Sequence, residues 1–199
     1  MAKLHFKYGT MNSGKSIDLM RTAYNYEEMG YDVLVLKPII DTKGLDKLNS
    51  RVGMERKVDI LIPKNALILP LIMNKTTKKL ACIFIDEAQF LTKKQIDNLF
   101  IITKKLDIPV ICYGLRNNFK MEGFEGSIRL LEIAEELEEI KTLCHCGEIA
   151  RYVGRKVDGQ FKMVGSEVVI DGENSNIEYV PLCGKCYLEQ VKGLELTGF

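Results

Sequence analysis

Short apolar stretches rich in β-branched and aromatic residues recur through the first 140 residues of the chain. Their length and composition predict buried β-strands at residues 3–8, 31–37, 81–86 and 109–115. Between them, apolar residues are spaced three or four positions apart, as one face of an α-helix requires. This spacing predicts helices at residues 14–30, 92–107 and 127–140.

The order of these elements predicts the fold class. Strands that alternate with helices form a parallel sheet covered on both faces, which makes the chain an α/β protein. Gly30 is a suitable C-cap for the first helix and Thr92 a suitable N-cap for the second. Ligands of parallel sheets bind beyond the carboxyl ends of the strands, so we expect the functional residues to follow strands.

The character of the sequence changes near residue 140. Residues 157–181 are rich in Gly, Asp and Asn and contain the turn pairs Asp158-Gly159 and Asp171-Gly172, with no helical period. We therefore predict two domains, residues 1–140 for the α/β core and residues 141–199 for a small appended domain.

Composition and charge narrow the range of partners. The chain has 199 residues, of which 46% are hydrophobic and 28% charged, and its formal net charge is +1. Such a balance provides no overall field to attract a polynucleotide or an anionic membrane, and we expect neither partner. No apolar run is long enough to span a bilayer, and the N-terminus lacks the pattern of a signal peptide. A cytoplasmic location is the resulting prediction.

A phosphate-binding motif follows the first predicted strand. Residues 9–16 read GTMNSGKS and match G-x-x-x-x-G-K-[ST] at every fixed position. Gly9 and Gly14 allow the backbone N–H groups to turn inward toward phosphate oxygens, and the helix N-terminus favours the same anion. Lys15 is suited to the β- and γ-phosphates, and Ser16 to Mg²⁺. The fold prediction becomes a P-loop (RecA-like) parallel sheet that binds a nucleotide.

Asp86 and Glu87 stand where the third predicted strand ends. One of two adjacent carboxylates on extended chain can hold Mg²⁺ while the other faces the phosphate acceptor. We assign Asp86 to the metal and Glu87 to the catalytic base. These residues do not separate a kinase, in which Glu87 deprotonates a hydroxyl, from an ATPase, in which it polarises water. The predicted nucleotide-binding set comprises Gly9, Thr10, Met11, Asn12, Ser13, Gly14, Lys15, Ser16, Asp86, Glu87, Ala88 and Gln89.

The six cysteines fall into two classes. Cys82 and Cys112 lie in apolar runs and are expected to be buried thiols. The others form two close pairs and predict one structural Zn²⁺ bound by Cys144, Cys146, Cys183 and Cys186. Because the first pair is C-x-C rather than C-x-x-C, a set that includes His145 and a site without metal are the alternatives.

A zinc ion at these positions would pin both ends of residues 147–182. This segment is polar and Gly-rich, and we interpret it as a lid over a small acceptor. The alternative is a zinc ribbon that binds nucleic acid, but acidic residues in the segment offset its basic ones.

Several motifs together resemble the cellular-type, zinc-containing thymidine kinases. They are spread over nearly the whole chain in the family's order, and the combination is far more specific than any one of them. The matching stretches are GTMNSGKS, FIDEAQF, YGLRNNF, the two cysteine pairs and VVIDGENSNIEYVPLCGKC.

The resemblance implies an activity and a substrate pocket. The protein would use ATP and Mg²⁺ to phosphorylate the 5′-hydroxyl of thymidine, giving thymidine monophosphate for DNA synthesis. A lasso loop from about Phe161 to Tyr179 would read the base mainly through backbone groups. A homotetramer and feedback inhibition by thymidine triphosphate (dTTP) are also implied. Residues implied to contact thymidine are Met11, Phe90, Leu115, Phe119, Val169, Ile170, Asp171, Gly172 and Tyr179.

The pattern alone would make Phe90, Leu115 and Phe119 core residues, so their assignment depends on the resemblance. Two positions depart from the family. Thr10 replaces a common Pro, and the Arg of a D-x-R triplet is absent, leaving Lys43 or Arg51 as the phosphate clamp. Two alternative functions stay open: a deoxynucleoside kinase of another base preference, and a small P-loop ATPase with a zinc ribbon that acts on nucleic acid.

Overall fold

The computed structural model describes residues 1–39, 46–50, 52–75, 80–163 and 176–193. A six-stranded sheet, in the order β5-β2-β6-β7-β1-β8, forms its centre, and every pairing in that sheet is parallel. This confirms the predicted α/β class. The strands of the sheet are β1 (Leu4–Gly9), β2 (Asp32–Pro38), β5 (Ile60–Ile62), β6 (Leu80–Ile85), β7 (Val110–Leu115) and β8 (Glu136–Glu139).

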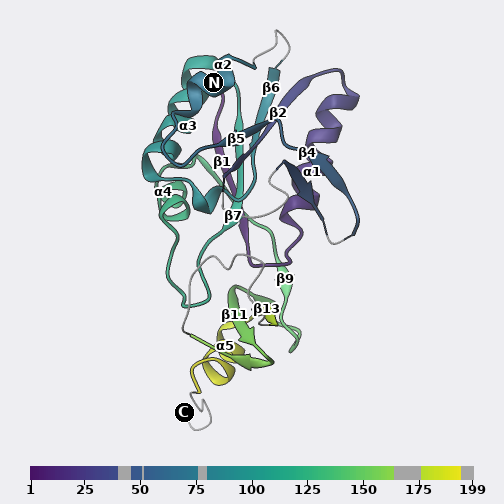
Figure 1. The fold of residues 1–199 in the computed structure, drawn as a ribbon, viewed down its shortest axis with the longest axis vertical. Coiled ribbons are helices and arrows are strands. Elements are labelled where there is room, and N and C mark those ends of the chain that lie inside the picture. The colour runs from purple at the N-terminus through teal and green to yellow at the C-terminus, as the bar shows by residue number, and fades with distance from the viewer. Residues whose placement is uncertain (40–45, 51, 76–79, 164–175, 194–199) are drawn as a thin grey trace.

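Helices cover both faces of the sheet. Figure 1 shows α1 (Lys15–Glu28) on one side, and α2 (Ile68–Met73), α3 (Lys93–Leu106) and α4 (Glu125–Ile133) on the other. Alternate residues of each strand serve the two layers. In β2, Val35 belongs to the core under α1 and Leu36 to the core under the other helices. Burial on both faces explains why these strands read as continuous apolar runs.

Two helix starts have identifiable caps. Thr92 caps α3 in a capping box with Gln95, as the sequence predicted for Thr92. α2 was not predicted, and no side chain of its own caps it. Instead Asn98 of α3 accepts hydrogen bonds from the amides of Ile68 and Leu69, at 2.9 and 3.1 Å. A side chain 30 residues away in sequence thus accepts hydrogen bonds from backbone amides of the first turn of α2, which have no partner within the helix.

One predicted helix is partly wrong. α4 ends at Ile133 and Ala134 is extended, so residues 136–139 form strand β8 on the edge of the sheet instead of continuing the helix. In the register, Glu138 lies opposite Lys7 and pairs with it at 3.1 Å. Backbone pairing to β1 and this charge match outweigh the helix propensity of the Glu-rich segment.

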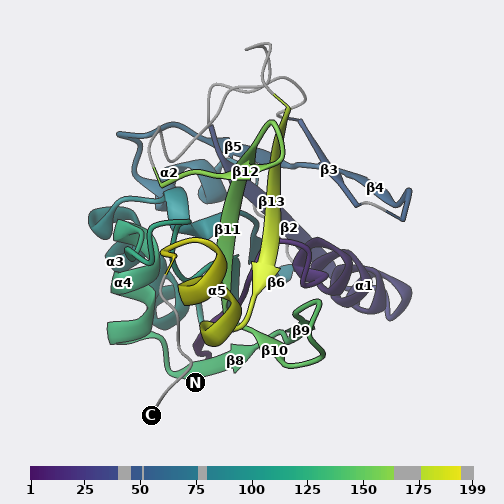
Figure 2. The ribbon, with the colours of Figure 1, turned by 90° about the horizontal axis from the view of Figure 1, so that it is seen from below.

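The polypeptide between β2 and β6 adds structure that the sequence did not predict. A hairpin of β3 (Lys47–Asn49) and β4 (Glu55–Lys57) projects beside α1 (Figure 2). Arg56 of β4 makes two hydrogen bonds to the Glu27 carboxylate of α1, at 2.7 and 2.8 Å. The hairpin is therefore attached to the helix that follows the phosphate-binding motif.

The residues after β8 form other, smaller sheets, and we call them the C-terminal module. Figure 1 shows β11, β13 and α5 of this module beyond the end of the main sheet at which β1 gives way to α1. A core that includes Leu182, Tyr187, Cys144, Cys183 and Cys186 holds it together. Its elements are β9 (Thr142–Leu143), β10 (Ile149–Ala150), β11 (Tyr152–Val157), β12 (Gln160–Phe161), β13 (Ile177–Leu182) and α5 (Gly184–Gln190).

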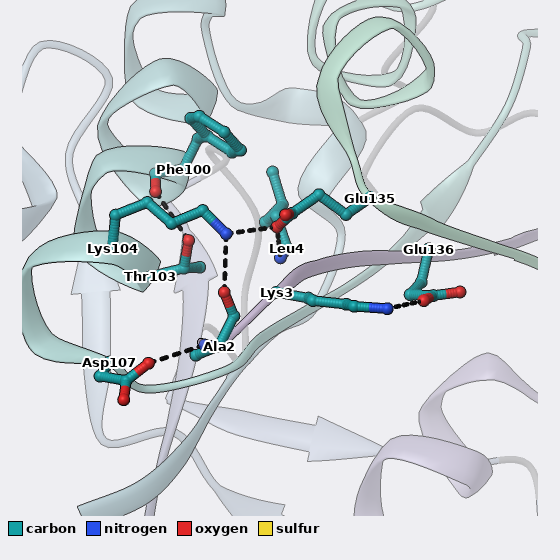
Figure 3. A network of polar contacts seen from close by, with 9 residues as sticks. All are labelled: Ala2, Lys3, Leu4, Phe100, Thr103, Lys104, Asp107, Glu135 and Glu136. Carbon is teal, nitrogen blue, oxygen red and sulfur yellow. Dashed lines mark hydrogen bonds and ion pairs between the residues drawn. The ribbon is translucent and has the colours of Figure 1, made fainter.

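A polar network fixes the opposite end of β1 (Figure 3). Lys104 of α3 donates to the carbonyl of Ala2 at 2.7 Å and to the carboxylate of Glu135 at 2.6 Å, and Asp107 accepts from the amide of Ala2. Lys3 pairs with Glu136 in the same region. These contacts anchor the start of β1 far from the motif at its other end.

No helix within the described residues has the length and apolar character needed to cross a membrane.

Candidate active site

The phosphate-binding motif forms a loop between β1 and α1. β1 ends at Gly9 and α1 begins at Lys15. Asn12 and Gly14 have positive φ angles of 64° and 85°, which turn the backbone sharply within the loop. The Lys15 ammonium group lies back over the loop and donates to the carbonyl of Thr10 at 2.6 Å. The loop thus has the alternating geometry of an anion-binding nest, with a cation over it.

Gly9 is required by close packing. A Cβ at this position would lie 2.5 Å from the carbonyl oxygen of Ile140 and 2.4 Å from Oγ of Ser13. The backbone that leads into the C-terminal module therefore presses directly on the start of the loop. Any side chain at residue 9 would displace one of them.

The acidic pair lies at the end of β6 and acts on Lys15. Burial, and after it the neighbouring Glu87 charge, raise the pKa of Asp86 to about 7. Burial lowers the pKa of Lys15, while Glu87 and Asp86 oppose that shift electrostatically. The ammonium group of Lys15 is therefore close enough to both carboxylates to interact with them electrostatically.

Glu87 has an unusual backbone conformation. Its φ and ψ are 51° and 38°, in the left-handed region that non-glycine residues seldom adopt. The chain reverses there into the short 3₁₀ helix η1 (Ala88–Phe90).

Ala88 and Gln89, which complete the predicted nucleotide-binding set, are both buried. The Gln89 side chain accepts a hydrogen bond from the amide of Leu115 at 3.1 Å and donates one to the Glu87 carboxylate at 2.5 Å. Gln89 therefore links the end of β7 to the acidic pair. Ser16, the predicted second magnesium ligand, is the second residue of α1.

The residues predicted to contact thymidine come from several elements. Met11 is half-buried in the phosphate loop, and Leu115 ends β7. Phe90 of η1 packs edge-on against Phe124, with 5.6 Å between ring centroids. Val169, Ile170, Asp171 and Gly172 lie outside the described residues.

Phe119 and Tyr179 lie at the C-terminal module. Phe119 is 2% exposed, and the guanidinium of Arg155 in β11 stacks 5.2 Å from its ring centroid. Tyr179 in β13 is directly opposite Arg155 in the register. The Tyr187 hydroxyl of α5 donates to the Phe119 carbonyl, so the YGLRNNF loop is bonded to the module at this point.

The four predicted zinc ligands form a compact cluster. Their sulfur atoms all lie within 4.8 Å of one another, and those of Cys146 and Cys183 are 3.6 Å apart. Four thiolates at the usual Zn–S distance of about 2.3 Å would be about 3.8 Å apart, so the donor set fits a tetrahedral zinc ion. His145 lies beside the cluster, with ring nitrogens 3.5 and 3.8 Å from Cys144 and Cys186 sulfurs.

Comparison with known proteins identifies the family. The family model described as thymidine kinase matches residues 2–187. A thymidine kinase of Pasteurella multocida is 42% identical over 193 residues, covering 96% of this chain and 99% of that protein. Those of Lactococcus lactis and Francisella tularensis subsp. holarctica are 41% and 39% identical, and each alignment covers at least 95% of both chains. The chain belongs to the thymidine kinase family. The resemblance inferred from the motifs is therefore confirmed.

Two features of the site in this thymidine kinase family member were not predicted from the sequence. The first is a polar group beneath α1, where Asp18 accepts hydrogen bonds from Lys7 of β1 and the Tyr113 hydroxyl of β7, at 3.1 and 2.9 Å. The sequence did contain a sign of this cluster, because Lys7 is a charged residue within the predicted strand 3–8 and a charge in a buried strand needs a partner. Lys43 and Arg51, the two candidates for a phosphate clamp, lie outside the described residues.

The second feature is a small hollow between the phosphate loop and the C-terminal module. Arg151, just before β11, pairs with Glu139 at the end of β8, and Arg116 donates to the Arg151 carbonyl. Sequence gave no indication of this junction, because its members come from four segments. The hollow is lined by Tyr8, Gly9, Thr10, Arg116, Asn117, Glu139 and Arg151.

Proposed function

We propose that the protein is an ATP-dependent thymidine kinase that transfers the γ-phosphate of ATP to the 5′-hydroxyl of thymidine. One observation carries the proposal: Lys15 of the phosphate loop and the adjacent carboxylates Asp86 and Glu87 act on one another at the carboxyl edge of a parallel sheet. A cation for the donor phosphates and a base for the acceptor hydroxyl are what such a transfer needs. Membership of the thymidine kinase family supports the choice of acceptor.

Residues 9–16 hold the donor in this account. The inward-facing amides of the loop and the N-terminus of α1 bind the phosphates, and Lys15 exchanges its bond to the Thr10 carbonyl for phosphate oxygens. Ser16 and Asp86 would hold Mg²⁺, which supplies charge neutralisation to the phosphates when bound. The buried Asp86 suits this role, since burial and the Glu87 charge raise its pKa to about 7 despite the opposing charges of Lys37 and Lys15, and a bound divalent cation would favour its ionised form.

Glu87 receives the proton of the 5′-hydroxyl as that oxygen attacks the γ-phosphorus. Glu87 lies at the turn from β6 into η1, and its carboxylate is proposed to face the acceptor while that of Asp86 holds the metal. Positioning and charge stabilisation supply most of the rate in phosphoryl transfer, and the base contributes the proton step.

The C-terminal module, which we take as the domain of residues 141–199, forms the acceptor side. Met11, Phe90, Leu115, Phe119 and Tyr179 are proposed to surround the base, with residues 169–172 completing the pocket. The contact of Tyr187 with the Phe119 carbonyl and the pairing of Arg151 with Glu139 support an acceptor pocket built between the module and the core. A zinc ion in the cysteine cluster would keep the ends of the lasso segment in place.

The test is an acceptor panel. Purified protein with Mg²⁺ and ATP labelled at the γ-phosphate is given thymidine, deoxyuridine, deoxycytidine or no acceptor. We expect label in the thymidine monophosphate product and little release of inorganic phosphate without acceptor. Preferred labelling of deoxycytidine would show that deoxycytidine, and not thymidine, is the substrate. Free hydrolysis that a polynucleotide stimulates would point to the ATPase alternative.

Assembly and regulation extend this proposal. We propose a cytoplasmic homotetramer inhibited by its pathway's end product, dTTP. Exposed apolar side chains on α3 and α4, including Ile101 and Ile128, are of the kind that a subunit interface covers. Light scattering tests the assembly state. Inhibition kinetics test dTTP, which should compete with thymidine if its base takes the acceptor pocket.

A further inference from the structure

The side chain of Gln89 bridges two parts of the site. It is 2% exposed and lies in η1, two residues after Glu87. Its Oε1 accepts from the backbone amide of Leu115 at 3.1 Å, and its Nε2 donates to Oε2 of Glu87 at 2.5 Å. The oxygen and the nitrogen of one buried side-chain amide are thus both hydrogen-bonded, the oxygen to the backbone of β7 and the nitrogen to the predicted base.

The direction of this bridge is fixed by chemistry. A backbone N–H can only donate, so the group that faces Leu115 must be the amide oxygen of Gln89. The NH₂ group must then face Glu87, whose carboxylate can only accept when ionised. The arrangement leaves Oε1 of Glu87, which accepts no hydrogen bond within the described part of the chain, as the oxygen for another donor.

The fold makes room for Gln89 at two glycines. A Cβ at Gly114 would lie 2.7 Å from Oε1 of Gln89 and 3.1 Å from its backbone nitrogen. A Cβ at Gly126 of α4 would lie 2.5 Å from the carbonyl oxygen of Ala88 and 3.0 Å from that of Gln89. β7 and α4 therefore enclose η1 from two sides, and the Gln89 amide has little freedom to turn.

From this geometry we propose that Gln89 is a positioning residue for the base. Its amide holds one oxygen of the Glu87 carboxylate, so that the other is presented to the acceptor hydroxyl. The inference rests on the proposed function, because Gln89 acts only by orienting Glu87, and Glu87 is a base only if that function is correct. Gln89 itself does not contact the reacting atoms. It differs from the earlier expectation that Gln89 contacts the nucleotide, which would affect ATP binding directly.

Gln89→Met tests the proposal, since methionine has similar length and no donor. The control is Gln95→Met. Gln95 is 4% exposed and its amide is also fully bonded, to Thr92, Pro63 and Ala66, in α3. Both variants lose a buried amide, so both lower stability. The Gln89 variant should also lose about 10- to 100-fold in kcat, a part of the 10²- to 10⁴-fold that a general base contributes, with unchanged KM for ATP.

A double-mutant cycle separates positioning from a structural effect. In the Glu87→Gln background there is no base to orient, so adding Gln89→Met should change kcat less than threefold, against the 10- to 100-fold loss in the wild-type background. Equal losses in both backgrounds would overturn the proposal. So would a change confined to KM for ATP, which would return Gln89 to nucleotide binding.

Gln89→Glu keeps the test decisive if the methionine variant does not fold. The new carboxylate still accepts from Leu115 but repels Glu87, so kcat should fall and recover partly as the pH is lowered. Undiminished kcat at pH 8 would contradict the proposal. Wild-type protein without transfer to thymidine would reject the proposed function itself, whereas active wild type with fully active Gln89 variants would reject only this inference.

Discussion

Lys7 of β1 and Asp18 of α1 form an ion pair between the sheet and α1, with 3.1 Å between Nζ and Oδ2. Each side chain is 18% exposed. The Tyr113 hydroxyl donates to the same carboxylate oxygen, and Arg21 donates to the other one. One carboxylate thus connects α1 to two strands of the sheet, one turn away from the phosphate loop.

Asp18→Asn should destabilise the protein by about 1–3 kcal/mol, since it weakens bonds to a largely buried charge. Although burial opposes ionisation, the hydrogen bonds from Arg21, Lys7 and Tyr113 leave the pKa of Asp18 lowered. Its stabilisation is therefore present above the ordinary value of 3.8 and is lost as the pH falls. The difference between variant and wild type in urea unfolding should be largest at pH 7 and shrink on acidification.

Glu55→Gln provides the comparison for Asp18. Glu55 pairs with Lys47 across the β3–β4 hairpin, and the side chains are 59% and 53% exposed. An exposed pair of this kind is worth less than about 1 kcal/mol. Equal destabilisation by the two substitutions would show that the Asp18 group does not hold α1.

Asp86→Asn should stabilise the protein in the absence of magnesium. The pKa of Asp86 is raised by burial from 3.8 to about 7, so the folded state binds a proton that the unfolded state releases. Wild-type stability therefore contains a contribution that declines from about pH 4 to pH 7, and the Asn variant lacks this decline. The variant's advantage in the free energy of unfolding should grow across that interval, while Mg²⁺ should stabilise only the wild type. An advantage independent of pH would contradict this account of Asp86.

Cys183→Ser should remove the metal from the C-terminal module. Elemental analysis of the wild type should find about one zinc ion per chain, as a four-thiolate site predicts, and the variant should contain far less. The module should become sensitive to protease near residues 141–193, and transfer to thymidine should fall with it. Cys82→Ala is the matched control, because Cys82 is buried in the core under α1. Full zinc content in the Cys183 variant would exclude the cluster as the site.

The elements that the sequence predicted well are those in which local and tertiary preferences agree. β1, α1 and the loop between them follow from an apolar strand, a glycine-containing motif and a helical period. Residues 136–139 show the opposite case. Their local preference is helical, but β1 offers an open edge and a lysine at position 7 opposite Glu138. A partner more than 100 residues away decides their structure, and no local pattern reports it.

The same distinction applies to the site. The acidic pair could be predicted because both residues are adjacent and follow a strand. The bridge from Leu115 through Gln89 to Glu87 could not, because it depends on how closely β7 approaches η1 at Gly114. The Lys7–Asp18–Tyr113 group likewise joins three elements whose register is set only when the sheet forms.

The most direct test of the central claim is a single-turnover measurement of γ-phosphate transfer to thymidine by wild type, Glu87→Gln and the control Glu55→Gln. The amide keeps the shape of the Glu87 side chain but cannot take a proton, so transfer should slow by about 10²- to 10⁴-fold. ATP binding, followed by calorimetry, should change little, and Glu55→Gln should match the wild type. Transfer to thymidine at the wild-type rate by Glu87→Gln would contradict the account.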